Sequence, residues 1–290
     1  MGLFNNYSKP GPGVSKDAPK KKGIFLYFEL LGRKFSKLFN LNLLYFVCSL
    51  PMFILYFLIY FFTTFNLVGL LKFSYEEMIL AQSILSLFLS SVSLLLLGSG
   101  PASAAMAYVL REYSKEEHVW LMSTFFSKMK ENFKQEMIVT VIDLVFVFLA
   151  SFAFIFYFTQ ASTSLVYPAL LILLVIFSLV FTCAHFYIHQ LIVTFENSLK
   201  DIFKNALLLT LSSLYKNILF TALFIGILYL TYVLHPVVAL LLYAVILISV
   251  LRFGVEFNVH SVIRKTVPAV CEAEEKEIDE ESLFEDSHRS

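Results

Sequence analysis

The chain has 290 residues, of which 58% are hydrophobic and 17% aromatic, and its formal net charge is zero. Soluble domains average about 45–50% apolar and about 25% charged residues, whereas only 15% of these residues are charged. The composition excludes a disordered chain, a collagen and a small disulfide-stapled secreted domain. It indicates an integral membrane protein with several spans. The three cysteines, Cys48, Cys183 and Cys271, are scattered, so neither a disulfide framework nor a cysteine metal site is expected.

The zero net charge conceals an uneven distribution of charge along the chain. Residues 272–286 contain nine acidic side chains and one lysine, so the rest of the protein is basic. We therefore divide the chain into a polar N-terminal segment (1–22), a membrane domain (23–265) and an acidic C-terminal tail (266–290). The tail is expected to be disordered because it has too few apolar residues to offset the entropy of ordering.

The membrane domain contains six apolar segments. A helix needs about 20 residues to cross about 30 Å of hydrocarbon, and the first four segments meet that length. The last two are shorter and are separated by His235-Pro236, which suits a tight turn between antiparallel helices. The predicted spans are 41–65, 79–98, 137–159, 165–188, 218–234 and 237–251.

The basic residues give the orientation of these spans. With six spans, 21 of the 22 Lys and Arg residues lie on one side of the membrane, and only Lys72 lies on the other. The positive-inside rule makes the basic side cytoplasmic. The sequence thus predicts both termini inside the cell.

Three cytoplasmic stretches have apolar residues spaced three and four apart, which is typical of amphipathic helices. They cover residues 24–38, 119–133 and 199–207, and each precedes a pair of spans. We expect an all-α membrane protein built from three hairpin units, each with one amphipathic helix on the cytoplasmic surface. Alternatively, these three helices pack on one another as a small cytoplasmic layer.

Several short motifs, in order along residues 4–265, resemble the YesL family, also called the DUF624 domain. They include Gly11-Pro12-Gly13-Val14, Lys20-Lys21-Lys22, Arg33-Lys34-Phe35, Asn40-Leu41-Asn42, Gly100-Pro101-Ala102, Tyr108-Val109-Leu110-Arg111, Glu116-Glu117-His118-Val119-Trp120, Lys130-Glu131-Asn132-Phe133-Lys134-Gln135, Phe186-Tyr187-Ile188 and Val193-Thr194-Phe195-Glu196. The acidic tail is not part of the family pattern.

This resemblance implies a multi-pass protein of the bacterial cytoplasmic membrane. Members of the family are often encoded beside sugar ABC-transport components, so the resemblance implies a role accessory to carbohydrate uptake, with sugar ABC-transporter permeases as partners. It implies no catalytic residues, because none are established for the family.

Asp143 is the most informative single residue because it lies about six residues inside the third predicted span. A carboxylate in hydrocarbon costs at least about 2.5 kcal/mol, so its side chain should face the bundle and be paired or protonated. Arg252, His185 and His189 are the candidate partners. Two interpretations of Asp143 stay open. It forms a structural pair with Arg252, or it belongs to a polar pathway for a substrate or for protons.

A second group combines two helical pairs at i, i+4 spacing: His185 with His189, and Glu256 with His260. Two such faces could ligate a divalent metal through imidazole and carboxylate. Interfacial hydrogen bonding, with Arg252 paired to Glu256, is the better interpretation of the same residues because no metal motif such as H-E-x-x-H occurs.

Three functions follow from these patterns. The leading hypothesis is a non-enzymatic protein that assists or regulates ABC-type carbohydrate uptake, without a cofactor, and the alternatives are a small transporter or channel around Asp143 and a membrane-embedded metalloenzyme. The expected partners are the lipid bilayer and other membrane proteins. Nucleic acid is not expected, since anionic lipid explains the basic inner surface more simply.

Overall fold

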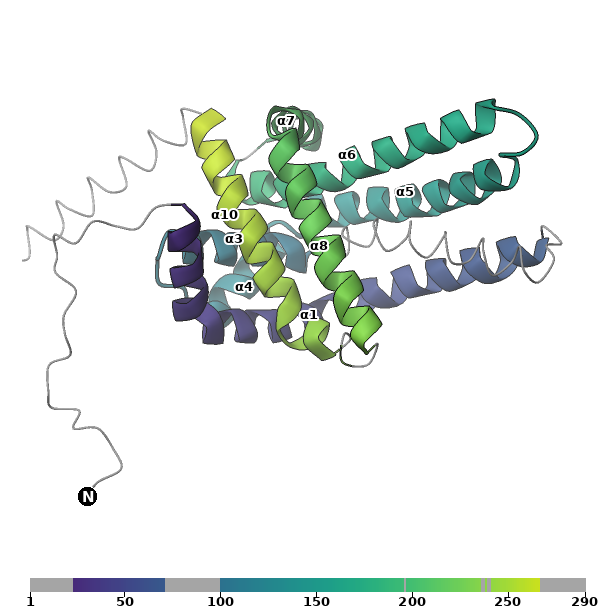
Figure 1. The fold of residues 1–290 in the computed structure, drawn as a ribbon. Coiled ribbons are helices and arrows are strands. Elements are labelled where there is room, and N and C mark those ends of the chain that lie inside the picture. The colour runs from purple at the N-terminus through teal and green to yellow at the C-terminus, as the bar shows by residue number, and fades with distance from the viewer. Residues whose placement is uncertain (1–22, 71–99, 196, 236–237, 239–240, 267–290) are drawn as a thin grey trace, which may run out of the picture.

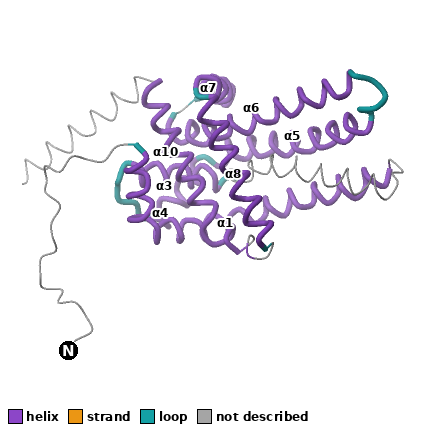
Figure 2. The backbone as a smooth tube through the Cα atoms, in the orientation of Figure 1, coloured by secondary structure: helices purple, strands orange, loops and turns teal. Residues whose placement is uncertain are grey.

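A computed structural model describes residues 23–70, 100–195, 197–235, 238 and 241–266, and every regular element in these ranges is a helix (Figures 1 and 2). The predicted second span (79–98), the segment 1–22 and nearly all of the acidic tail lie outside the described residues. The elements are α1 (Ile24–Leu70), α3 (Ala102–Ser114), α4 (Leu121–Glu131), α5 (Phe133–Thr159), α6 (Val166–Thr194), α7 (Leu199–Ser212), α8 (Leu214–Leu234), the π-helix η2 (Tyr243–Leu247) and α10 (Ile248–Thr266).

Among the described residues, four stretches are long and apolar enough to cross a bilayer, or up to five if α7 and the first part of α8, which meet at 90°, form one broken span. The four are Phe25–Leu55, Phe133–Thr159, Val166–Thr194 and Tyr243–Ile263. The last starts six residues after the start of the predicted segment 237–251 and ends twelve residues after its end, because Arg252 does not end the span. Arg252 is only 5% exposed and pairs with Glu256 inside the bundle, so the helix continues past it.

The first predicted amphipathic stretch is not a separate helix. Residues 24–38 form the start of α1, which runs without interruption to Leu70. No proline occurs between Gly23 and Leu50, and the single Gly32 is tolerated inside a helix. The other two amphipathic stretches do form helices of their own, α4 and α7.

Helix α3 lies at the centre of the buried core and packs against α1, α4, α6 and α10. Four of its first six residues are alanine, and nearly all its residues are buried, since small side chains let neighbouring helices approach closely. Gly100 precedes α3 with a φ of +89°, which favours glycine, and Pro101 occupies the N-cap position of the helix.

Helices α5 and α6 run side by side as an antiparallel hairpin. Together with the C-terminal part of α1, they extend beyond the cluster formed by α3, α4 and α10 (Figure 1). The large apolar side chains on this extension are exposed, as expected for a surface that faces lipid. The buried ionisable residues of the hairpin lie at the opposite end.

Candidate functional site

The hairpin places two acidic residues of α5 opposite two histidines of α6. Glu136 and Asp143 lie seven residues apart, which puts them on one face of α5, and His185 and His189 share one face of α6. Asp143 lies 20 residues before Thr163, which is in the connecting turn, and His185 lies 22 residues after Thr163. Because the two helices are antiparallel, these nearly equal distances from the turn place the two side chains side by side. Glu136 and His189 are matched in the same way.

Asp143 and His185 form a buried pair. Nε2 of His185 lies 2.7 Å from Oδ1 of Asp143, and Nδ1 donates to the carbonyl oxygen of Phe181 at 2.9 Å. Because a carbonyl only accepts, Nδ1 carries a hydrogen, and the contact between Nε2 and Oδ1 needs a second one. The pair therefore holds one proton more than a neutral imidazole and a carboxylate would.

Glu136 and His189 form a second buried pair, which lies about two turns before Asp143 on α5 and one turn after His185 on α6. Nδ1 of His189 lies 3.0 Å from both carboxylate oxygens of Glu136, and the two histidine rings have centroids 6.0 Å apart. Glu136 was not predicted from sequence because it follows the polar run Lys130–Gln135 and resembles a solvated residue. Its seven-residue spacing from Asp143 is the signal that could have found it.

Arg252 pairs with Glu256 on α10 rather than with Asp143. Its guanidinium donates to Oε1 of Glu256 at 3.1 Å and also acts electrostatically on Glu136 of α5. Both side chains of the pair are almost fully buried. Arg252 therefore connects α10 to the α5–α6 hairpin.

The connections extend to α3 through Arg111. Arg111 donates to Glu112 and to the hydroxyl of Thr194, both at 2.9 Å, and acts electrostatically on Glu256. Burial opposes ionisation of Glu112, but hydrogen bonding with Glu117 and the charges of Arg111 and Lys115 together hold the pKa of Glu112 below its usual range.

We call these eight residues the ionic network: Arg111, Glu112, Glu136, Asp143, His185, His189, Arg252 and Glu256. It joins α3, α5, α6 and α10, and it holds four carboxyl groups but only two arginines. Charge balance in a low-dielectric core thus requires the histidines or the carboxyl groups to carry protons. The arrangement can hold helices together and bind protons.

The described residues do not bring together the alternative metal site of His185, His189, Glu256 and His260. Among the described residues, no group of three or more His, Cys, Asp or Glu residues could hold a metal ion. His185 and His189 face Asp143 and Glu136, while Glu256 faces Arg252. His260 lies one turn after Glu256 on α10, outside the ionic network.

Residues 79–154 match the family model described as "Protein of unknown function, DUF624". The matched range includes α3, α4 and most of α5, with Arg111, Glu112, Glu136 and Asp143 of the ionic network. The resemblance to the DUF624 family is confirmed over this part of the chain. No curated protein and no solved structure matches the sequence.

Proposed function

We propose that this multi-pass membrane protein with a DUF624 region has six spans and both termini in the cytoplasm. The segregation of 21 of 22 basic residues supports this topology. The turn between α5 and α6, residues 160–165, contains no charged residue and would lie outside the cell.

Cysteine labelling in cells tests the topology. In a background without Cys48, Cys183 and Cys271, a membrane-impermeant maleimide should label Ser162→Cys in intact cells. The matched variant Ser123→Cys, on the exposed side of α4, should be labelled only after the cells are opened. Labelling of both variants, or of Ser123→Cys alone, in intact cells would refute the orientation.

We further propose that the protein is not an enzyme and that it assists or regulates ABC-type carbohydrate uptake in a bacterial cytoplasmic membrane. The observation that carries the non-enzymatic role is the ionic network, whose ionisable groups pair with one another within α3 and α10 and between α5 and α6. A core of this kind suits a protein that acts through partners. The carbohydrate class rests on the YesL and DUF624 resemblance.

Crosslinking in native membranes, followed by purification, tests the accessory role. Sugar permeases should copurify with the wild-type protein, and cells without the gene should take up less labelled sugar. Leu173→Ala, on the lipid-facing surface, should restore uptake to the deletion strain. Normal uptake of every tested sugar in the deletion strain, with no permease recovered, would refute the proposal.

One observation favours a second candidate, a transporter or channel with a proton pathway around Asp143. Oδ2 of Asp143 and Oε2 of Glu256 are buried, and neither has a hydrogen-bond partner among the described residues. Such acceptors could bind water or pass protons.

Purified protein in vesicles containing a pH-sensitive dye distinguishes the two candidates. A transporter should move protons without partners and should lose that flux in Asp143→Asn. An accessory protein should give no flux above empty vesicles while still copurifying with permeases.

A further inference from the structure

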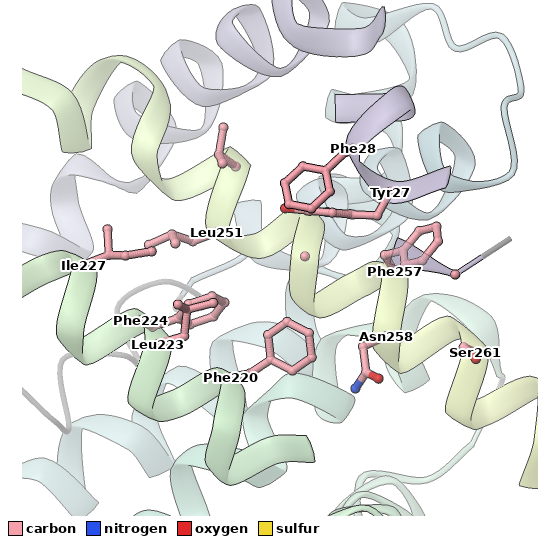
Figure 3. Close-up of a pocket in the computed structure, with 13 residues that line it drawn as sticks. Tyr27, Phe28, Phe220, Leu223, Phe224, Ile227, Leu251, Phe257, Asn258 and Ser261 are labelled. Carbon is pink, nitrogen blue, oxygen red and sulfur yellow. The ribbon is translucent and has the colours of Figure 1, made fainter. Parts of the chain in front are cut away.

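A cavity of about 460 Å³ lies between the start of α1, α8 and α10 (Figure 3). Its volume falls within the range of about 300–1,000 Å³ that is typical of small-molecule sites. None of its lining residues belongs to the ionic network. The cavity is therefore separate from the site described above.

The walls of the cavity are mostly apolar, and apart from the hydroxyl of Tyr27 its polar side chains lie toward one end. Phe220, Phe224 and Ile227 of α8 face Leu251 of α10 across the space (Figure 3). Further along α10, the amide of Asn258 and the hydroxyl of Ser261 line the other end. Neither side chain makes a hydrogen bond within the described part of the chain, so both can bind a ligand's polar group.

The cavity has the length of one membrane leaflet. Along α10 it runs from Val250 to Ser261, eleven residues or about 16 Å at the α-helical rise. The hydrocarbon core of a bilayer is about 30 Å thick, so one leaflet is about 15 Å. Asn258 and Ser261 lie near the end of the candidate span Tyr243–Ile263, where a lipid chain would join its headgroup.

The cavity is continuous with the lipid-facing surface of α8. Leu223 lines it and is still 52% exposed, and Leu219 and Leu230 on the same helix are exposed as well. The chain's own terminal segments are poor occupants. Residues 1–22 carry five lysines and residues 272–286 carry nine acidic side chains, whereas the cavity walls are apolar.

We propose that this cavity binds one acyl chain of a cytoplasmic-leaflet phospholipid, with Asn258 and Ser261 donating hydrogen bonds to its ester oxygens. The chain enters beside Leu223 and lies along α10 against the aromatic side chains of α8. This inference rests on the membrane topology and is independent of the role in carbohydrate uptake.

Photocrosslinking in vesicles of phosphatidylethanolamine and phosphatidylglycerol tests the site. A phosphatidylglycerol with a diazirine at the end of one acyl chain should label peptides of α8 and α10 around Phe224 and Leu251. Leu223→Trp and Ile227→Trp together should lower this labelling about tenfold, because they displace two or more methylenes from the cavity. Leu219→Trp is the matched control on the same helix and should leave the labelling unchanged.

The polar end is tested separately with Asn258→Leu and Ser261→Ala. Together these changes should lower the recovery of copurified phospholipid severalfold and leave the melting temperature near the wild-type value.

Equal labelling of wild type and the double tryptophan variant would overturn the proposal. So would a rise in labelling when residues 1–22 are deleted, or a loss of dimers in Leu223→Trp, since these results would assign the cavity to the N-terminal segment or to a second copy.

Discussion

The two halves of α6 have the same helical backbone but different surroundings. From Thr182 to Ile192, every residue except Phe186 is buried, and both histidines of the ionic network lie there. None of residues 165–177, all of which the structure describes, is buried, and Ile172 and Leu173 are each 61% exposed. The inner half, which carries the histidines, packs against α3, α5, α7 and α10, whereas the outer half packs against α5 and exposes apolar side chains on its other faces.

The difference shows where a membrane helix can carry ionisable groups. A charged side chain facing lipid costs several kcal/mol, so such residues occur where other helices supply partners. In this protein the outer half of the hairpin gives length and a lipid-facing surface, and the inner half gives specific contacts. Substitutions should therefore have very different effects in the two halves.

Arg252→Met should have the largest effect. It leaves the buried carboxylate of Glu256 without its ion-pair partner, and breaking a buried ion pair costs about 3–5 kcal/mol. We expect a sharp fall in folded yield and in the melting temperature, measured by size-exclusion chromatography after heating. Lys204→Met removes the same charge from the exposed surface of α7 and should change neither quantity. Equal behaviour of the two variants would remove the distinction between enclosed and exposed regions.

The pair Asp143–His185 should show strong coupling in a double-mutant cycle. Asp143→Leu and His185→Leu each leave one buried polar group without its partner, whereas the double variant leaves neither. The loss of stability in the double variant should be smaller than the sum of the single losses by about 0.5–3 kcal/mol. The measurement is the melting temperature of all four proteins in one detergent. Additive losses would show that the 2.7 Å contact does not stabilise the fold.

Gly100→Ala should have an intermediate effect. The φ of +89° is unfavourable for alanine, and its Cβ would lie 2.9 Å from Cγ of Met52. We expect a loss of about 1–2 kcal/mol. Gly32→Ala is the control: Gly32 lies inside α1 with nothing near its Cβ position, so alanine there should be neutral or slightly stabilising. A loss at Gly32 as large as that at Gly100 would contradict this account.

Leu173→Ala, in the outer half of α6, should have the smallest effect. Leu173 faces lipid, and lipid chains can fill the space that the shorter side chain leaves. The change in stability should stay within about 0.5 kcal/mol. A loss comparable to that of Arg252→Met would show that the outer half packs against protein, either another part of this chain or a second molecule.

Hydropathy and spacing predicted the all-helical class and the positions of α5, α6 and α8, because long apolar runs and short polar turns are local properties. The end of the last span was not predictable in this way. The charge of Arg252 suggested a membrane boundary at residue 251, but the pairing with Glu256 lets the helix continue. A local pattern does not show whether a charge is neutralised by a partner on the same buried face.

The candidate site shows the same limit. Asp143 stood out because apolar residues surround it, and His185 was one of three partners considered. Choosing among the three required the pairing of α5 with α6, which follows from the position of their turn. Glu136 was missed because its neighbours in the sequence are polar. It is nevertheless buried, and its partner His189 lies more than 40 positions away, so no local pattern indicated the pair.

The π-helix η2 has a consequence for chain length. Its carbonyls at Tyr243 and Ala244 accept hydrogen bonds from Nδ2 of Asn42 on α1, and Oδ1 of Asn42 accepts from the backbone N–H of Ser249. A π turn accommodates one extra residue while the flanking α-helical turns keep their directions. Deleting one residue within Tyr243–Leu247 should therefore leave Arg252 and Glu256 facing the bundle, whereas the same deletion later in α10 would rotate the following residues by about 100°. Related chains should vary by single insertions or deletions at this turn more readily than anywhere else along α10.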